Sequence, residues 1–588
     1  MDFIFDIETT GLHISDQWVC MAWASSYKNA PEVTFDINEA LEVLLAAIGD
    51  GDRLVGHNII CFDLPKMCWE ERDKLGTYSL LEEIRINAEM ADTLIASRHL
   101  FPARKSHGMK SWAEELMADY PCGPKPEIED YSTASTTLMK NRCIEDVRAE
   151  ACLWDYLHHS QGVPDCIPMA DFEHKWYALC VELLATGLPY SFEDTLRVLE
   201  HLCNKAKMPQ SVLNARFPGV NFNSTKQVDS ALKKLYGSGL PISSRTGTPT
   251  MKKDRREEIC QKYPAMRAHY EYRDASNSLD FINPPPGGKK SKRYVGQFTA
   301  KSPFWDGKAI YPRLNYVGTR TGRMQYESPP VQQMPKKVRR IIRAPNGWVL
   351  VGMDIVALEM AWTGYLLEEL CGDSTIMNQV RNGESAKKLT LEAFKPAMDN
   401  VRVHGGTTLE DVAKTINYAL IYGIGKAQLA ANLNLPMEGN DKAKSIALVE
   451  ECAEKRFPGM KMLNKTVQGG MEGKVLTGFY GTKVLTEPWK ALNAFVQNSG
   501  ADYARRVMYL WWSELKRLWG FDAVRACVYN MDELQILAMC ANDEDREDLE
   551  MELRFTSGRM EGLFKQEYDC EYVAGIDWSI GKTWEETH

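Results

Sequence analysis

Apolar runs interrupted by acidic residues mark the first part of the chain. The opening run, MDFIFDIETTGL, predicts a strand on which Asp6 and Glu8 point to the same side, because residues two apart share a face. A second apolar run leads into HNIICFD, which ends at Asp63, and a helix-like stretch carries Asp146. Four acids that converge on two metal ions would suit phosphodiester hydrolysis, although any one of them alone is more simply a solvated surface acid.

Residues 409–423 have the spacing of a helix. Lys414, Tyr418 and Tyr422 fall at i, i+4 and i+8 and form one stripe, while the apolar residues lie on other faces. A phosphate would bind the ammonium group and a flat base would lie on the rings. For an isolated helix, two interface tyrosines and a solvated lysine would be the simpler interpretation.

Two further acidic positions flank this helix in the sequence. WVLVGMDIVALEMA predicts a strand that ends at Asp354, and VRACVYNMDELQILA predicts a hairpin with Asp532 and Glu533 at its tip. Asp354 and Asp532 form a second candidate site for two metal ions. Together with the stripe, they indicate phosphoryl transfer from a nucleotide.

The composition restricts the class of protein. A chain of 588 residues with 44% apolar residues is too long for one core, so we expect several domains. Its 15 cysteines form no CxxC pair, and no apolar run is long enough to span a membrane, so we expect a cytoplasmic protein without a zinc site. The net charge of −10 leaves room for a local basic strip that binds nucleic acid.

DIETTGL and HNIICFD together resemble the 3′–5′ proofreading exonucleases that use four metal-binding acids. The resemblance implies an α/β, ribonuclease H-like exonuclease domain over residues 1–165 with Asp6, Glu8, Asp63 and Asp146 as ligands. Members of that group carry Tyr or His near the last acid to orient the attacking water. The tyrosine position is Arg142 here, which could pair with Asp146 across a helix turn.

The remainder resembles family A DNA polymerases, the polymerase I type and its phage relatives. The resemblance rests on TRTGR, on DIVALE as motif A, on KTINYALIYG as motif B, on MDE as motif C and on KALNAFVQNSGAD. It implies an α+β right-hand polymerase domain over residues 166–588. Its expected parts are a thumb at about 170–300, a palm at about 301–375 and 495–588, and fingers at about 376–494.

The same resemblance implies roles for individual residues. Lys414 would contact the triphosphate, as would Lys387, while Tyr418 would meet the sugar and base and Tyr422 the templating position. Glu359 would block a 2′-hydroxyl. Asp354, Asp532 and Glu533 would form the catalytic acid group. The residues expected to contact DNA are Arg320, Arg323, Gln332, Asn493 and Gln497.

Several positions depart from the family pattern. Glu410 stands in place of the motif B arginine, Met531 in place of a histidine and Ala361 in place of an arginine. An acid that faces a triphosphate is unfavourable unless it is paired, so Glu410 would turn away or engage Lys387 or Arg402.

The sequence therefore predicts a DNA-directed DNA polymerase with a proofreading exonuclease. We expect two Mg²⁺ ions per active site, replaceable by Mn²⁺, and primer-template DNA and deoxynucleoside triphosphates as partners. We expect a monomeric phage enzyme in the host cytoplasm, and the substitutions near the nascent pair suggest adaptation to a modified base such as 2-aminoadenine. The alternatives are an exonuclease with a degenerate polymerase half and a non-catalytic DNA-binding scaffold.

Overall fold

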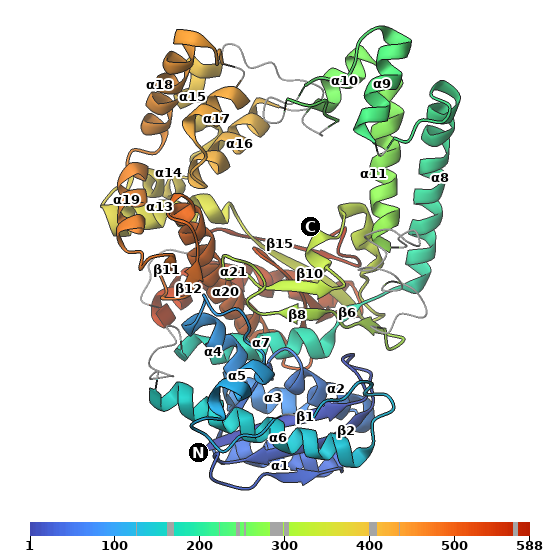
Figure 1. Ribbon diagram of the computed structural model, residues 1–588, viewed down its shortest axis with the longest axis vertical. Helices are drawn as coiled ribbons and strands as arrows, with labels where there is room; N and C mark the ends of the chain where they lie inside the picture. Colours follow the sequence, from blue (N-terminus) through green and yellow to red (C-terminus); the bar gives the residue numbers. More distant parts are fainter. Residues whose placement is uncertain are drawn as a thin grey trace.

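Two helical arms rise from an α/β base in the computed structural model (Figure 1). The structure describes residues 1–124, 126–160, 170–222, 224–242, 247–251, 255–282, 298, 305–398, 408–433, 435–568 and 574–588. Arg402 lies outside these residues. Within the described chain, none of the helices combines the length and the apolar character that crossing a membrane requires.

The lower part of the base is a five-stranded sheet in the order β3-β2-β1-β4-β5, where β1 pairs parallel with β4 and antiparallel with β2. Its strands are β1 Asp2–Thr9, β2 Trp18–Ala24, β3 Glu32–Thr34, β4 Arg53–Gly56 and β5 Glu89–Asp92. Its helices are α1 Ile37–Gly49, α2 Asp63–Leu75, α3 Ser79–Ile86, α4 Thr93–Leu100, α5 Met109–Leu116 and α6 Thr136–Asp155, which a π-helical turn, Tyr156–Ser160, extends.

Both faces of β1 are covered, and this decides where its acids point. Phe5 and Ile7 join a core with residues of α1 and α2, whereas Ile4 packs in a separate core with residues of α6. Asp6 and Glu8 share the side of Ile4, because alternate residues of a strand face the same way. The strand register therefore directs both carboxylates towards α6.

Helix α7, Ala170–Thr186, connects the lower sheet to the rest of the protein. It packs on α2 and α3 below and on β13 and α20 above. From the sequence, this segment was expected to begin the thumb. Its Glu182 is 1% exposed. The carboxylate accepts hydrogen bonds from Trp512 Nε1 at 3.0 Å and from the amide of Ala526 at 2.6 Å, and it pairs with the buried ammonium of Lys516.

The upper part of the base is an antiparallel sheet in the order β13-β14-β10-β15. Its strands are β10 Trp348–Ile355, β13 Val524–Asn530, β14 Glu533–Met539 and β15 Ile576–Gly581. The helices beside it are α13 Leu358–Cys371, α20 Ala491–Trp519 and α21 Asp543–Tyr568. The expected boundary between fingers and palm, near residue 495, falls inside α20. Smaller elements complete this region: β6 Leu188–Pro189, β7 Ala309–Ile310, β8 Arg313–Asn315, β9 Gln325–Ser328 and short 3-10 helices at Val331–Gln333 and Lys336–Ile341.

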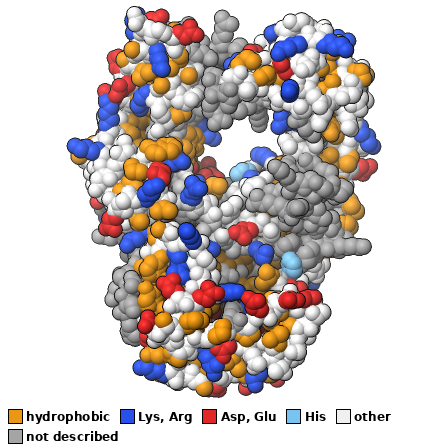
Figure 2. Space-filling view, viewed as in Figure 1, with side chains coloured by type: hydrophobic (Ala, Val, Ile, Leu, Met, Phe, Trp, Pro, Cys, Tyr) orange, Lys and Arg blue, Asp and Glu red, His pale blue; other side chains and the backbone are white. Residues whose placement is uncertain are grey.

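The two arms enclose a hollow above this sheet, and the C-terminus lies at its base (Figures 1 and 2). One arm contains α8 Phe192–Arg216, α9 Thr225–Tyr236, α10 Arg256–Lys262 and α11 Met266–Ile282. The other contains α14 Thr375–Arg381, α15 Ala386–Met398, α16 Leu409–Ile421, α17 Lys426–Asn432, α18 Gly439–Arg456 and α19 Met460–Gly469. Below it lie the hairpin β11 Val475–Thr477 and β12 Lys483–Leu485 and a 3-10 turn, Pro488–Lys490.

We predict that Glu182→Ala destabilises the base, because it leaves the ammonium of Lys516 buried without a counter-charge. Loss of one partner of a buried pair costs about 3–5 kcal/mol. Urea denaturation followed by tryptophan fluorescence measures the change. The matched control is Glu567→Ala, which removes the partner of Lys175 from a pair whose side chains are 34% exposed and should cost less than about 1 kcal/mol. Equal losses in the two variants would contradict the prediction.

Candidate active sites

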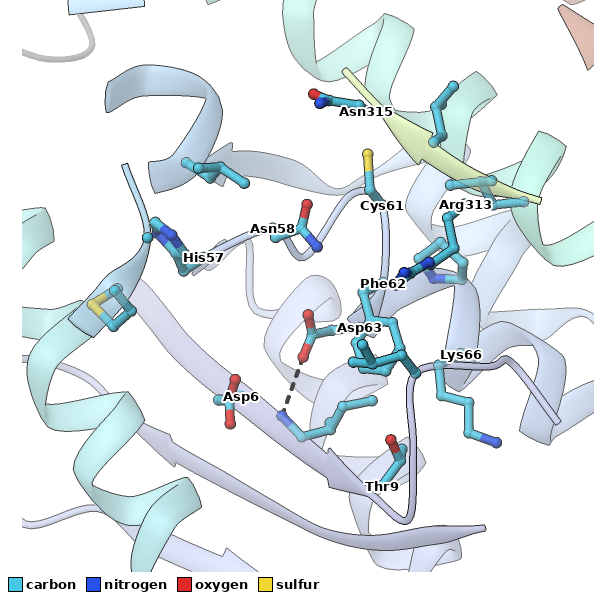
Figure 3. Close-up of a pocket in the computed structure, with 18 of the residues that line it drawn as sticks. Asp6, Thr9, His57, Asn58, Cys61, Phe62, Asp63, Lys66, Arg313 and Asn315 are labelled. Carbon is cyan, nitrogen blue, oxygen red and sulfur yellow. Dashed lines mark hydrogen bonds between the residues drawn. The ribbon is translucent and has the colours of Figure 1, made fainter. Parts of the chain in front are cut away.

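Three elements bring together the acids of the N-terminal sheet. Asp6 and Glu8 lie on β1, Asp63 begins α2 and Asp146 lies in α6. Ligand atoms of Asp6, Glu8 and Asp146 all lie within 4.8 Å of one another. Asp63 is outside this group of three, but it accepts a hydrogen bond from the amide of Ile7 at 3.2 Å and lies across the cavity from Asp6 (Figure 3).

Burial and mutual repulsion govern the charge of this site. Burial, followed by the charges of Asp146 and Glu150, raises the pKa of Asp6 well above its usual range. Burial also raises the pKa of Asp63 to about 8. Oδ2 of Asp6 is buried and has no hydrogen-bond partner in the described part of the chain. A buried acceptor without a donor, among acids whose ionised forms are disfavoured, fits a divalent cation.

A guanidinium group and a tyrosine ring flank these carboxylates. Arg142 Nε lies 3.1 Å from Glu8 Oε1 and 3.7 Å from Asp146 Oδ2, so the expected pair with Asp146 forms and a closer one with Glu8 joins it. The guanidinium lies 5.3 Å from the ring centre of Tyr131. Burial raises the pKa of Tyr131, and the acids of the site add to this effect. A tyrosine therefore does reach the site, from the loop before α6.

The acids of the upper sheet lie on neighbouring strands. Asp354 on β10 is in register with Glu533 on β14, and the amide of Ile355 donates to the carbonyl of Asp532 at 3.0 Å. Burial, followed by the charges of Asp532 and Glu533, raises the pKa of Asp354 to about 7. Burial also raises the pKa of Asp532. The hairpin thus holds Asp354 and Asp532 at the same end of the sheet.

Glu533 has a different environment from the other two acids. It is 1% exposed and accepts hydrogen bonds from Trp584 Nε1, from Gln535 Nε2 at 2.7 Å and from Asn530 Nδ2 at 3.1 Å. His588 Nδ1 lies 2.8 Å from Oε2 of Glu533. Burial would raise the pKa of Glu533, but the hydrogen bonds from His588 and Trp584 outweigh it, and the pKa is lowered. Protein donors therefore occupy this carboxylate.

The stripe on α16 forms as its spacing predicts. The rings of Tyr418 and Tyr422 are 5.9 Å apart, and Lys414 Nζ lies 5.9 Å from the ring centre of Tyr418. The hydroxyl of Tyr422 donates to Glu359 Oε1 at 3.0 Å. Burial raises the pKa of Tyr418 to about 12, and charges on Glu359 and the two sheet acids contribute. The stripe therefore faces the acids of the upper sheet.

The residues expected to contact DNA lie in different settings. Arg320, Asn493 and Gln497 line a second cavity of about 620 Å³, which extends from α20 to the lower part of the base. Arg323 Nε donates to the carbonyl of Gln497 at 3.5 Å. Gln332 instead bonds the backbone around β9 through both ends of its side-chain amide, at 3.3 and 3.2 Å.

Glu410 is paired. Its Oε2 lies 3.5 Å from Lys387 Nζ, with side chains that are 62% and 48% exposed. An exposed pair of this kind contributes about 0–1 kcal/mol, so a polyanion could displace Glu410 from Lys387 at little cost.

Three described residues other than glycine have a positive φ: Asn58 at 75°, Ala357 at 50° and Met531 at 62°. Asn58 precedes Asp63 in the same loop, Ala357 lies between Asp354 and Glu359, and Met531 directly precedes Asp532. Strained backbone concentrates at functional sites, so these positions support the two acid groups as sites.

A family comparison identifies the group to which the chain belongs. The family described as DNA polymerase family A matches residues 198–586, which is more than half of the chain. The chain belongs to DNA polymerase family A.

Individual relatives of this chain are distant. The chain is 22% identical to the thermostable DNA polymerase I of Thermus aquaticus over 442 residues, which cover 70% of this chain and 48% of the relative. It is 24% identical to DNA polymerase I of Helicobacter pylori over 356 residues, which cover 58% of this chain and 35% of the relative. The chain thus matches less than half the length of these relatives.

A solved structure shares the fold of the family A chain. The POL domain of Pol1 from M. smegmatis, in complex with DNA primer-template and dNTP, aligns with a TM-score of 0.71 and 15% identity. The alignment covers 100% of this chain and 96% of that chain.

Two features of the two acid sites had no signal in the local sequence pattern. Tyr131 lies before α6, which begins at Thr136, and reaches the acids through the path of a loop. The hydrogen bonds of Glu533 to Trp584 and His588 join segments about fifty residues apart. Their residue types mark Tyr131, Trp584 and His588 as candidate aromatic and donor groups, but nothing in the local sequence indicates that they approach the acids.

We predict that Arg142→Ala strengthens divalent-cation binding at the N-terminal site. The guanidinium 3.1 Å from Glu8 competes for the carboxylates that a metal ion would use, so its removal should tighten the apparent Kd for Mn²⁺ by roughly tenfold. The rise of the Tm with Mn²⁺ concentration measures this. Arg148→Ala is the control, because it removes a cation from α6 that pairs with Glu145. Identical Mn²⁺ dependence in both variants would contradict the prediction.

Proposed function

We propose that this family A protein is a DNA-directed DNA polymerase and that its N-terminal domain is a 3′–5′ proofreading exonuclease. The observation that carries the proposal is the pair formed by Asp354 at the end of β10 and Asp532 in the neighbouring β13–β14 turn, with Lys414 and Tyr418 on α16 and Tyr422 at its C-cap facing them. Binding of DNA needs cations and rings but no buried carboxylates, whose burial is unfavourable without cations.

In the polymerase site, Asp354 and Asp532 would hold two Mg²⁺ ions, which when bound stabilise the charged oxygens of phosphoryl transfer and which Mn²⁺ would replace. Lys414 would contact the triphosphate of the incoming deoxynucleotide, and Lys387 would join it after release from Glu410. Tyr418 would lie against the sugar and base and Tyr422 at the templating position. Glu359, held by the hydroxyl of Tyr422, would fill the space of a 2′-hydroxyl.

Primer-template DNA would occupy the hollow between the two arms (Figure 2). Arg323 and Gln497, which contact each other beside the acid pair, would reach the minor groove. Hydrogen-bond acceptors there are common to all base pairs and report the shape of the pair. Arg320 and Asn493 would contact the DNA along the second cavity, whereas Gln332 would act by holding β9.

The N-terminal sheet order and the position of α6 support a ribonuclease H-like exonuclease over residues 1–165. The carboxylates of its site, Asp6, Glu8, Asp63 and Asp146, would hold metal ions that activate water for attack on the terminal phosphodiester. Tyr131 would orient that water in place of the tyrosine that the family carries on the helix. Arg142 would reduce the repulsion among the acids and compete with the metal ions.

Two other functions are an exonuclease with a degenerate polymerase half, which rests on the departures from the family pattern, and a non-catalytic DNA-binding scaffold. Glu410 is paired with Lys387, and Ala361 is buried in α13. Met531 occupies the turn before Asp532, and its sulfur lies 3.6 Å from Arg323 Nη1. Each departure is accommodated without loss of an acid, which favours a working polymerase. A phage origin, a place in the host cytoplasm, a monomeric state and adaptation to a modified base such as 2-aminoadenine stay predictions of the sequence.

The two active sites should be separable by mutation. Asp354→Asn or Asp532→Asn should abolish primer extension and leave degradation of single strands, because each removes one charge from the acid pair of the upper sheet. The double change Asp6→Ala and Glu8→Ala should do the reverse. Primer extension with Mg²⁺, with each nucleotide omitted in turn, and single-strand digestion measure both activities. Loss of both activities from either change, in a protein shown to be folded, would contradict the proposal of two separate sites.

Glu359→Ala should raise the use of ribonucleotides relative to deoxynucleotides by on the order of tenfold, which corresponds to about 1.4 kcal/mol. The physical reason is the space that the carboxylate leaves beside the sugar. Tyr422→Phe is the matched control, because it removes the hydrogen bond to Glu359 and keeps the carboxylate. Competition between the two nucleotide types on one template gives the ratio. If Tyr422→Phe shifts the ratio as much as Glu359→Ala, the carboxylate acts through its position and not through its bulk.

A further inference from the structure

The cavity beside the N-terminal acids has walls from both parts of the base. It has a volume of about 710 Å³, with Asp6, Glu8, Asp63 and Asp146 among the residues that line it. Residues of β8, which belongs to the polymerase part of the chain, line the same cavity (Figure 3). The acid site is therefore completed by a strand more than 160 residues later in the sequence.

Arg313 is the first residue of β8 and lines this cavity. It is exposed, and it makes no ion pair with any residue that the structure describes. Figure 3 shows its side chain reaching from β8 towards Phe62, which directly precedes Asp63. Its charge also reaches the opposite loop, since after burial and the opposing effect of Asp16 it lowers the pKa of His13.

Two of the other cations that line the cavity are already engaged. Arg98, which also lines the cavity, donates to Asn315 Oδ1, and the amide of Asn315 donates to Glu327 at 2.9 Å. Lys66 is buried and paired with Glu70 at 2.5 Å. Arg313 differs from both because its guanidinium has no such partner and can meet an anion from solution.

We propose that Arg313 binds a backbone phosphate of the single DNA strand whose 3′ end enters the N-terminal site. The polymerase strand β8 thus completes the DNA-binding surface of that site. The proposal rests on the exonuclease function proposed above and adds a residue to it. Asn315 supports this surface by tying β8 to α4 through Arg98.

The charge distribution of the cavity explains the need for such a residue. Four carboxylates that line the cavity repel the phosphates of an approaching strand, and the guanidinium of Arg313, which lines the same cavity, offsets this repulsion for one of them. Each phosphate contact contributes about 0.7 to the slope of log K against log salt for single strands. Arg313 should therefore account for about 0.7 of that slope.

The test compares Arg313→Ala with Lys308→Ala, which removes an exposed cation from the same segment outside the cavity. The KM for degradation of a single-stranded oligothymidylate should rise at least fivefold in Arg313→Ala with little change in kcat, and Lys308→Ala should match the unmutated protein. In the Asp6→Ala, Glu8→Ala background, the same oligonucleotide should bind with a salt slope smaller by about 0.7 when Arg313 is also changed. Thermal unfolding midpoints check that every variant is folded.

An unchanged KM and salt slope in Arg313→Ala, or equal changes in both variants, would overturn the proposal while leaving the exonuclease intact. If the unmutated protein degrades no single strand, the exonuclease function fails instead. The salt slope of oligonucleotide binding then still decides whether Arg313 contacts a phosphate.

Discussion

A single buried carboxylate on α7 connects the two acid sites. Glu182 is almost fully buried, so water cannot replace its partners. Its interactions with Trp512, Lys516 and the amide of Ala526 must therefore all be kept. The same helix packs on α2 and α3, and α2 begins at Asp63. The hairpin β13–β14 and the N-terminal acids are thereby attached to opposite sides of one helix, which fixes their separation.

Each of the two sites places several buried carboxylates close together, and the two sites reduce the resulting repulsion in different ways. In the N-terminal site a guanidinium from the protein lies beside Glu8 and Asp146 and supplies part of the positive charge. In the upper sheet, donors from four residues occupy Glu533, which leaves Asp354 and Asp532 as the carboxylates with raised pKa values. Arg142 would therefore compete with bound metal ions at the N-terminal site.

Local pattern was enough to predict the elements that carry the acids and the stripe, because strand and helix periods fix which side chains share a face. The strand of Asp6 and Glu8, the hairpin of Asp532 and the helix of Lys414 all form as predicted. The approach of Tyr131 to Arg142 depends on loop paths and domain packing, which no local period encodes. The sequence indicated Gln332 as a residue that contacts DNA, but its side chain hydrogen-bonds the backbone around β9. This contact depends on how β9 folds and could not be read from the sequence.

The unusual backbone at both sites has a physical explanation in the same packing. A side chain at positive φ is unfavourable by roughly 1 kcal/mol or more unless neighbouring contacts hold it. Met531 is held in the turn between β13 and β14, whose pairing continues to Asn530 and Glu533 on either side. Asn58 is held by the hydrogen bond that its backbone amide donates to Asp92 Oδ1 at 3.0 Å, and Asp92 also caps α4. The strained residues directly precede Asp532 and lie in the loop before Asp63, and the regular elements around them supply the contacts that hold this backbone.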